Sequence, residues 1–227
     1  MIKNHTNRAF DNDLRILRDR ILLIAGRVEK MVANAIKSLS ENDTALAQKT
    51  IDYDKSIDSD EVIVDRMSIE LLAQRQPVGQ DLRFIVSVIK MVTYFERLGD
   101  LAIKICHRII ELNRLDRSHD AGDIADMAKS VQAMIRETLE AFLERDYEKA
   151  LSVIMKDDAV DELHHLITKR LIAEMHAHKE LVENYYHLLS IAKWLERMGD
   201  HCTNLAEIII YMIKGQDVRH KRLAPTE

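Results

Sequence analysis

The sequence predicts an all-α protein that consists of two tandem, homologous bundles, each of three long antiparallel helices. Turn-forming residues are scarce, with 6 Gly and 2 Pro among 227 residues, which excludes the many tight turns of a β-sandwich or barrel. Apolar residues recur at steps of three and four along extended segments, the spacing of an amphipathic helix. A motif near the middle of the chain also recurs near its end, which indicates a duplicated domain.

The first three helices have recognisable boundaries. An apolar stripe from Leu14 to Leu39 predicts a first helix over about 9–40. Asp43 can then cap a second helix, which runs from Thr44 to about residue 74. Pro77 and Gly79 interrupt the pattern before a third helix, which extends to about residue 113.

Three more helices are expected in the second half. The polar segment 116–123 predicts the longest loop, followed by a fourth helix to Glu144. Asp146 can cap a fifth helix that reaches about residue 176, and the sixth runs from about 180 to 214. Gly215 is suited to ending it. The basic segment 214–222 is read as a short, polar, solvated tail.

The repeat predicts how these helices group. Glu-Arg-Leu-Gly-Asp at 96–100 recurs as Glu-Arg-Met-Gly-Asp at 196–200, and an Ile pair follows each copy. We therefore expect a first three-helix bundle over residues 1–115 and a second over 116–227.

Charge and composition narrow the function. The net charge of −5 makes nucleic acid an improbable main partner. Cys106 and Cys202 do not form a disulfide framework, which favours a reducing cytoplasm, and we read both as small buried side chains. The first 13 residues show no secretory signal, and no apolar run is long enough for a membrane span.

Pairs of acidic residues four positions apart lie on or beside the apolar stripes of four helices, where unpaired charge would be costly. In each bundle, two such pairs on neighbouring helices could converge on hard metal ions such as Mg, Mn, Fe or Ca, or on Zn. The eight candidate metal ligands are Asp54, Asp58, Glu96, Asp100, Asp157, Asp161, Glu196 and Asp200. From the pattern alone, metal binding and a solvated acidic face are equally good interpretations.

The chain resembles the PhoU family of phosphate-signalling regulators over residues 9–222. The resemblance rests on Arg-Gln-Pro-Val-Gly-Gln-Asp-Leu-Arg at 75–83, on the duplicated pentapeptide, and on Lys-Gly-Gln-Asp-Val-Arg-His at 214–220. It implies a non-enzymatic, cytoplasmic negative regulator of the phosphate-starvation response that forms a homodimer or higher oligomer. It also implies two partners, a sensor histidine kinase and the ATPase subunit of the phosphate ABC transporter. The protein would contact the membrane only through these partners, and it would restrain phosphate uptake.

The resemblance further implies multinuclear metal clusters, one per bundle, held by the eight carboxylates named above. The metal would be a divalent or trivalent ion, Fe, Mn, Zn or Mg. Lys104 accompanies the first site where Asn204 accompanies the second, so we expect the second site to bind metal more readily. Two alternatives stay open: a ferritin-like carboxylate–metal enzyme, against which the single Glu-x-x-His at 162–165 argues, and a helical adaptor without metal.

Overall fold

The computed structural model describes residues 8–53, 57–115 and 122–219, with only the backbone described for 57–59. Within these ranges the secondary structure is helical, and no strand is present. The helices are α1 (Arg8–Glu41), α2 (Thr44–Asp52), α3 (Ile57–Arg75), α4 (Gly79–Arg114), α5 (Gly122–Glu144), α6 (Tyr147–Ala177), the 3₁₀ turn η2 (Lys179–Leu181) and α7 (Val182–Lys214). The all-α prediction is confirmed.

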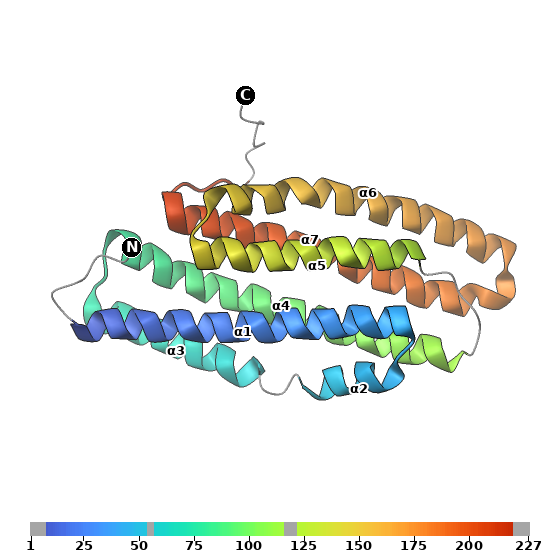
Figure 1. Cartoon of the computed structure of the whole chain (residues 1–227), viewed down its shortest axis with the longest axis horizontal. Coiled ribbons are helices and arrows are strands. Elements are labelled where there is room, and N and C mark those ends of the chain that lie inside the picture. Colours follow the sequence, from blue (N-terminus) through green and yellow to red (C-terminus); the bar gives the residue numbers. More distant parts are fainter. Residues whose placement is uncertain (1–7, 54–56, 116–121, 220–227) are drawn as a thin grey trace, which may run out of the picture.

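The helices form an elongated body with two layers of long rods (Figure 1). Helices α1 to α4 lie together in one half, and α5, α6 and α7 lie together in the other. Helix α4 packs against α7, and α1 packs against α5, so the two halves share a continuous core. In the described part of the chain, no helix is both long enough and apolar enough to cross a membrane.

One helix boundary differs from the prediction. The expected helix over 44–74 is described as two helices, α2 and α3, with residues 54–56 between them outside the described ranges. Helix α2 ends in a tight turn, in which the Tyr53 N–H donates to Thr50 O at 3.3 Å. The described residues therefore hold seven α-helices where the sequence predicts six.

The predicted caps are present. Asp43 accepts a hydrogen bond from the Leu46 N–H at 2.9 Å, and Asp146 accepts from the N–H groups of Glu148 and Lys149 in the first turn of α6. Gly215 ends α7 in the left-handed conformation, with φ of 72°, which a residue with a Cβ rarely adopts.

The C-terminal segment Gly215–Arg219 is not the wholly solvated tail that we expected. The turn at Gly215 leads the chain back along the bundle, and the Val218 side chain is buried, 7% exposed, in the common core. Burial of the apolar Val218 side chain is energetically favourable, so this segment packs against the core, which a wholly polar tail would not do. Residues 220–227 lie outside the described ranges.

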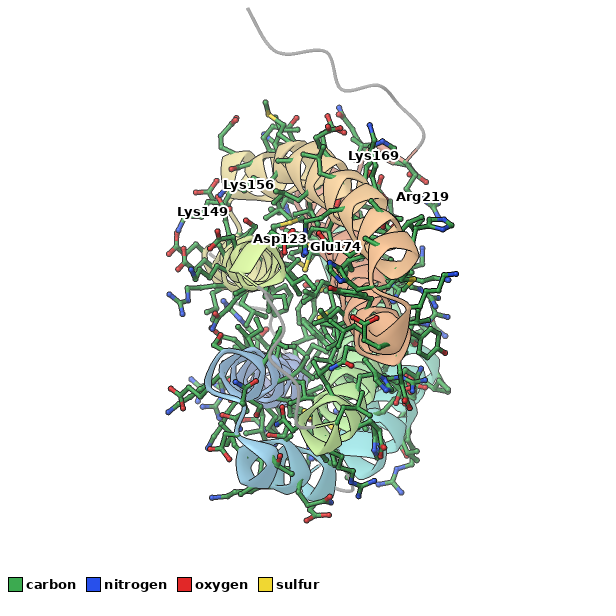
Figure 2. All side chains as sticks on the ribbon, turned by 90° about the vertical axis from the view of Figure 1, so that its right-hand side faces the viewer. Asp123, Lys149, Lys156, Lys169, Glu174 and Arg219 are labelled. Carbon is green, nitrogen blue, oxygen red and sulfur yellow. The ribbon has the colours of Figure 1, made fainter. Side chains whose placement is uncertain are left out.

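Ion pairs also hold α6 against α5. Lys149 Nζ lies 3.0 Å from both Glu140 Oε2 and Glu144 Oε2, and Lys156 pairs with Glu137. Figure 2 shows Lys149 and Lys156 on the side of α6 that faces α5. Partly exposed pairs of this kind contribute little to stability because solvent screens them, so apolar packing still dominates the fold.

Candidate carboxylate site

Helices α6 and α7, which run side by side in Figure 1, carry the second carboxylate site. Asp157 and Asp161 lie one turn apart on α6, and Glu196 and Asp200 lie one turn apart on α7. Asp157 and Glu196 are half-buried, whereas Asp161 and Asp200 are exposed. The site therefore extends from the edge of the core to the surface.

Gly199 allows a close approach between these two helices. A Cβ atom built at residue 199 would lie 2.9 Å from Asp157 Oδ1 and 3.4 Å from Val160 Cγ1. Gly199 is buried, so the Asp157 carboxylate lies directly against the backbone of α7. In the second bundle, the glycine of the repeated pentapeptide is therefore explained by a local contact, because a side chain at residue 199 would clash with Asp157.

The Asp157 carboxyl is electrostatically strained. Its pKa is raised from 3.8 to about 6, first by burial and then by the charges of Asp161, Asp200 and Asp158. The nearby Thr203 hydroxyl acts the other way and lowers the pKa. The Asp157 Oδ1 atom is buried and accepts no hydrogen bond of normal geometry in the described structure, which is costly for a carboxylate.

The other carboxyls belong to the same electrostatic group. Burial raises the pKa of Glu196 and that of Asp200, and in both cases the Asp161 charge adds to the rise. Arg197 opposes both shifts, but it is exposed and forms no ion pair with either carboxyl in the described structure. Four carboxyls from two helices therefore share one region of excess negative charge.

The described residues do not form a complete metal site. Within the described ranges, no group of three or more His, Cys, Asp or Glu side chains is arranged to hold a metal ion. The donor chemistry nonetheless suits a hard cation, because it combines mutually repelling carboxylates with a buried, unpartnered carboxylate oxygen. Metal binding here would require the exposed carboxylates to turn toward Asp157.

The first carboxylate site is described only in part. Asp54 lies outside the described residues, and Asp58 lies in α3 but its side chain is not described. Glu96 and Asp100 lie one turn apart on α4, at the positions of Glu196 and Asp200 on α7 and with the same degrees of exposure. Lys104 Nζ lies 3.7 Å from Asp100 Oδ2, so a cation does accompany this site. In the second bundle, Asn204 instead donates to the Asp200 backbone carbonyl at 2.6 Å.

Sequence reasoning missed the surroundings of His201. Its ring packs against Tyr94 of α4, with centroids 5.6 Å apart. Its pKa is lowered from 6.5 to about 4, first by burial and then by the charges of Arg97 and Arg197. Two aromatic residues 107 positions apart reveal no such contact in the sequence, because it depends on how α4 packs on α7.

The two cysteines are buried, as the sequence predicts. Burial raises the pKa of Cys106 to about 12 and raises that of Cys202 as well. Both thiols therefore stay protonated at neutral pH, the state of an inert core side chain.

Known proteins share this sequence and fold. The family model of the PhoU domain matches residues 21–109 and 124–209 of this chain. Two relatives carry the name phosphate-specific transport system accessory protein PhoU homolog. The one from Pseudomonas aeruginosa is 34% identical, over 96% of this chain and 91% of the relative. The one from Clostridium acetobutylicum is 36% identical, over 94% of this chain and 98% of the relative.

Two crystal structures also superpose over most of the chain. PhoU from Pseudomonas aeruginosa has a TM-score of 0.88 and 34% identity, covering 91% of this chain and 100% of that one. The phosphate transport system regulatory protein PhoU from Streptococcus pneumoniae has a TM-score of 0.85 and 27% identity, covering 92% and 99%. Since the family model matches both repeats and the fold agrees throughout, this chain belongs to the PhoU family.

Proposed function

We propose that this protein is a cytoplasmic negative regulator of the phosphate-starvation response. It would couple the phosphate ABC transporter, through its ATPase subunit, to a sensor histidine kinase, and it would restrain phosphate uptake. Support comes from membership of the PhoU family and from relatives that are named as accessory or regulatory proteins of phosphate transport. Those names describe no catalytic activity, and we propose a homo-oligomeric adaptor rather than an enzyme.

We further propose that the adaptor binds metal through its carboxylates. Asp157, Asp161, Glu196 and Asp200 would hold the ions of the second bundle, and Glu96 and Asp100 would act with Asp54 and Asp58 in the first. The observation that carries this proposal is the buried Asp157 Oδ1, which lies against Gly199 and accepts no hydrogen bond of normal geometry from the described residues. A bound Fe, Mn, Zn or Mg ion would neutralise the carboxylates and cross-link two helices of a bundle.

Metal content tests the site. Protein purified without chelator would be compared with a variant that carries Asp157→Asn, Asp161→Asn, Glu196→Gln and Asp200→Asn, using plasma mass spectrometry. We expect bound metal in the wild type, a loss in this variant, and no loss in the control Asp158→Asn, an exposed neighbour on α6. Equal metal content in all three proteins would show that these carboxylates are not ligands.

The biological role has a separate test. Deleting the gene should derepress phosphate-starvation genes while phosphate is abundant, and the wild-type protein should restore repression. Complementation with the carboxylate variant then separates the two proposals. Restored repression by a metal-free variant would leave the regulator and remove metal from its mechanism, whereas normal repression in the deletion strain would contradict the regulator itself.

A further inference from the structure

A cavity of about 450 Å³ lies between α4 and α7, and the C-terminal segment completes its wall. Helix α4 contributes Lys90, Tyr94 and Arg97, one turn apart along the same face. Helix α7 contributes Tyr211, and the C-terminal segment contributes Arg219. This volume is within the range of small-molecule sites, which are concave and carry a few convergent polar groups.

The C-terminal wall of the cavity is held in place. Val218 is buried, and the Asp217 carboxylate accepts from the Arg219 backbone N–H at 3.1 Å and from its Nε at 2.9 Å. Gly215 turns the chain beside α4, where a Cβ atom would lie 3.4 Å from the Arg83 guanidinium. Figure 2 shows Arg219 at the edge of the molecule on the side away from α5.

Two of the cations in the wall form no ion pair with a carboxylate of the described residues. Within the described structure neither Lys90 nor Arg97 forms an ion pair, and each instead lies near a tyrosine ring. Lys90 Nζ is 5.9 Å from the centroid of Tyr211, and Arg97 Cζ is 5.4 Å from that of Tyr94. The acidic side chains of the wall are Asp217, which pairs with Arg219, and Glu207. Among the described residues, three cations therefore line the cavity against two carboxylates.

These features indicate the chemical class of ligand. Converging Arg and Lys groups recognise oxyanions, and a phosphoryl group at neutral pH carries close to two negative charges that can engage several cations at once. The tyrosine rings and the volume leave room for more than the anion. We propose that this cavity binds a phosphorylated small molecule of nucleotide size, with its phosphoryl oxygens at Lys90, Arg97 and Arg219 and its ring near Tyr94 and Tyr211.

Calorimetric titration of the full chain tests the proposal. The probes are AMP, inorganic phosphate and adenosine, each in the presence of chelator so that metal at the carboxylates plays no part. AMP should bind saturably, and Arg97→Gln and Lys90→Gln should each weaken it about tenfold, the loss expected for one charge-assisted contact. Arg197→Gln is the matched control, because Arg197 is the repeat counterpart of Arg97 and lies outside the cavity.

The three probes distinguish the two sources of a phosphoryl group. If AMP binds more tightly than either phosphate or adenosine, the ligand is an organic phosphate. If inorganic phosphate binds as well as AMP and loses affinity in the same variants, the ligand is the free anion at the proposed cations, and the proposed ligand of nucleotide size is wrong. Absence of saturable binding by AMP and phosphate, or equal affinity in the wild type and Arg97→Gln, would overturn the proposal. Arg219→Gln, at an exposed position, repeats the test independently of α4.

Discussion

Gly199 on α7 leaves the space that the Asp157 carboxylate of α6 occupies, since a Cβ atom at residue 199 would lie 2.9 Å from Asp157 Oδ1. That separation is too short for a real contact, so a side chain at 199 and this position of the carboxylate exclude each other. The glycine of the repeated pentapeptide and the acidic pair of the neighbouring helix are therefore one structural unit.

Gly199→Ala should move the Asp157 carboxylate and reduce the metal retained by the second bundle. The protein should still fold, because Ala is better than Gly inside a helix by about 1 kcal/mol and the displaced group is the end of a side chain. Metal content and thermal unfolding, measured together, check this. Gly26→Ala is the control, because nothing lies within 4 Å of a Cβ atom there. Metal loss in both variants would show that Gly199 has no special role.

Asp157→Asn should stabilise the protein once metal has been removed. The pKa of Asp157, raised to about 6 from its ordinary 3.8, means that the folded state binds more protons than the unfolded state between these values. The ionised carboxylate therefore costs stability above about pH 6, and this cost fades as the pH falls through that window. Asparagine has no such charge. Because solvent screens this half-buried group and reduces the full effect of the shift, the advantage of asparagine at neutral pH is on the order of 1 kcal/mol, or about 2–4 °C in Tm.

Thermal unfolding in chelator at neutral pH measures this difference. Asp158 is an exposed neighbour whose charge adds less to the pKa shift of Asp157 than those of Asp161 and Asp200. Asp158→Asn should therefore raise the Tm less than Asp157→Asn does. A lower Tm for Asp157→Asn than for the wild type in chelator would contradict the proposed repulsion among the carboxylates.

The sequence predicts the second carboxylate site better than the cavity. Glu196 and Asp200 continue an apolar stripe, and periodicity places them at the edge of the core, where the structure finds the first half-buried and the second exposed. Arg97 and Arg219 line the same cavity because α4 packs on α7 and because the chain turns at Gly215. Local patterns carry no information about such distant contacts, so Arg219 reads from sequence as part of a solvated tail.

Lys104→Gln should increase metal binding at the first carboxylate site. Lys104 Nζ lies 3.7 Å from Asp100 Oδ2, so a competing cation occupies the surroundings of a proposed ligand. At the matched position of the second bundle, Asn204 carries no charge and donates to a backbone carbonyl. Metal titration of a variant whose second site is removed isolates this effect. Lys37→Gln, which breaks an exposed pair with Glu41 of similar length on α1, should change nothing.

His187 should make the protein less stable in mild acid. It is a buried residue of α7, 5% exposed, and burial, with the nearby Arg108 charge, lowers its pKa below the ordinary 6.5. As the pH falls through 6.5, the unfolded chain takes up a proton at this residue and the folded state does not, so the free energy of unfolding decreases. Above that value both states are neutral at His187, and the effect vanishes.

Denaturant unfolding of His187→Gln at about pH 8 and about pH 5.5 tests this linkage. The variant should be less stable than the wild type at the higher pH, because a packed ring is lost, yet its free energy of unfolding should fall less between the two conditions. His165→Gln, at an exposed position on α6, should show the full wild-type decrease. If His187→Gln also shows the full decrease, another group causes the acid sensitivity, and the most buried histidine of α7 does not contribute to it.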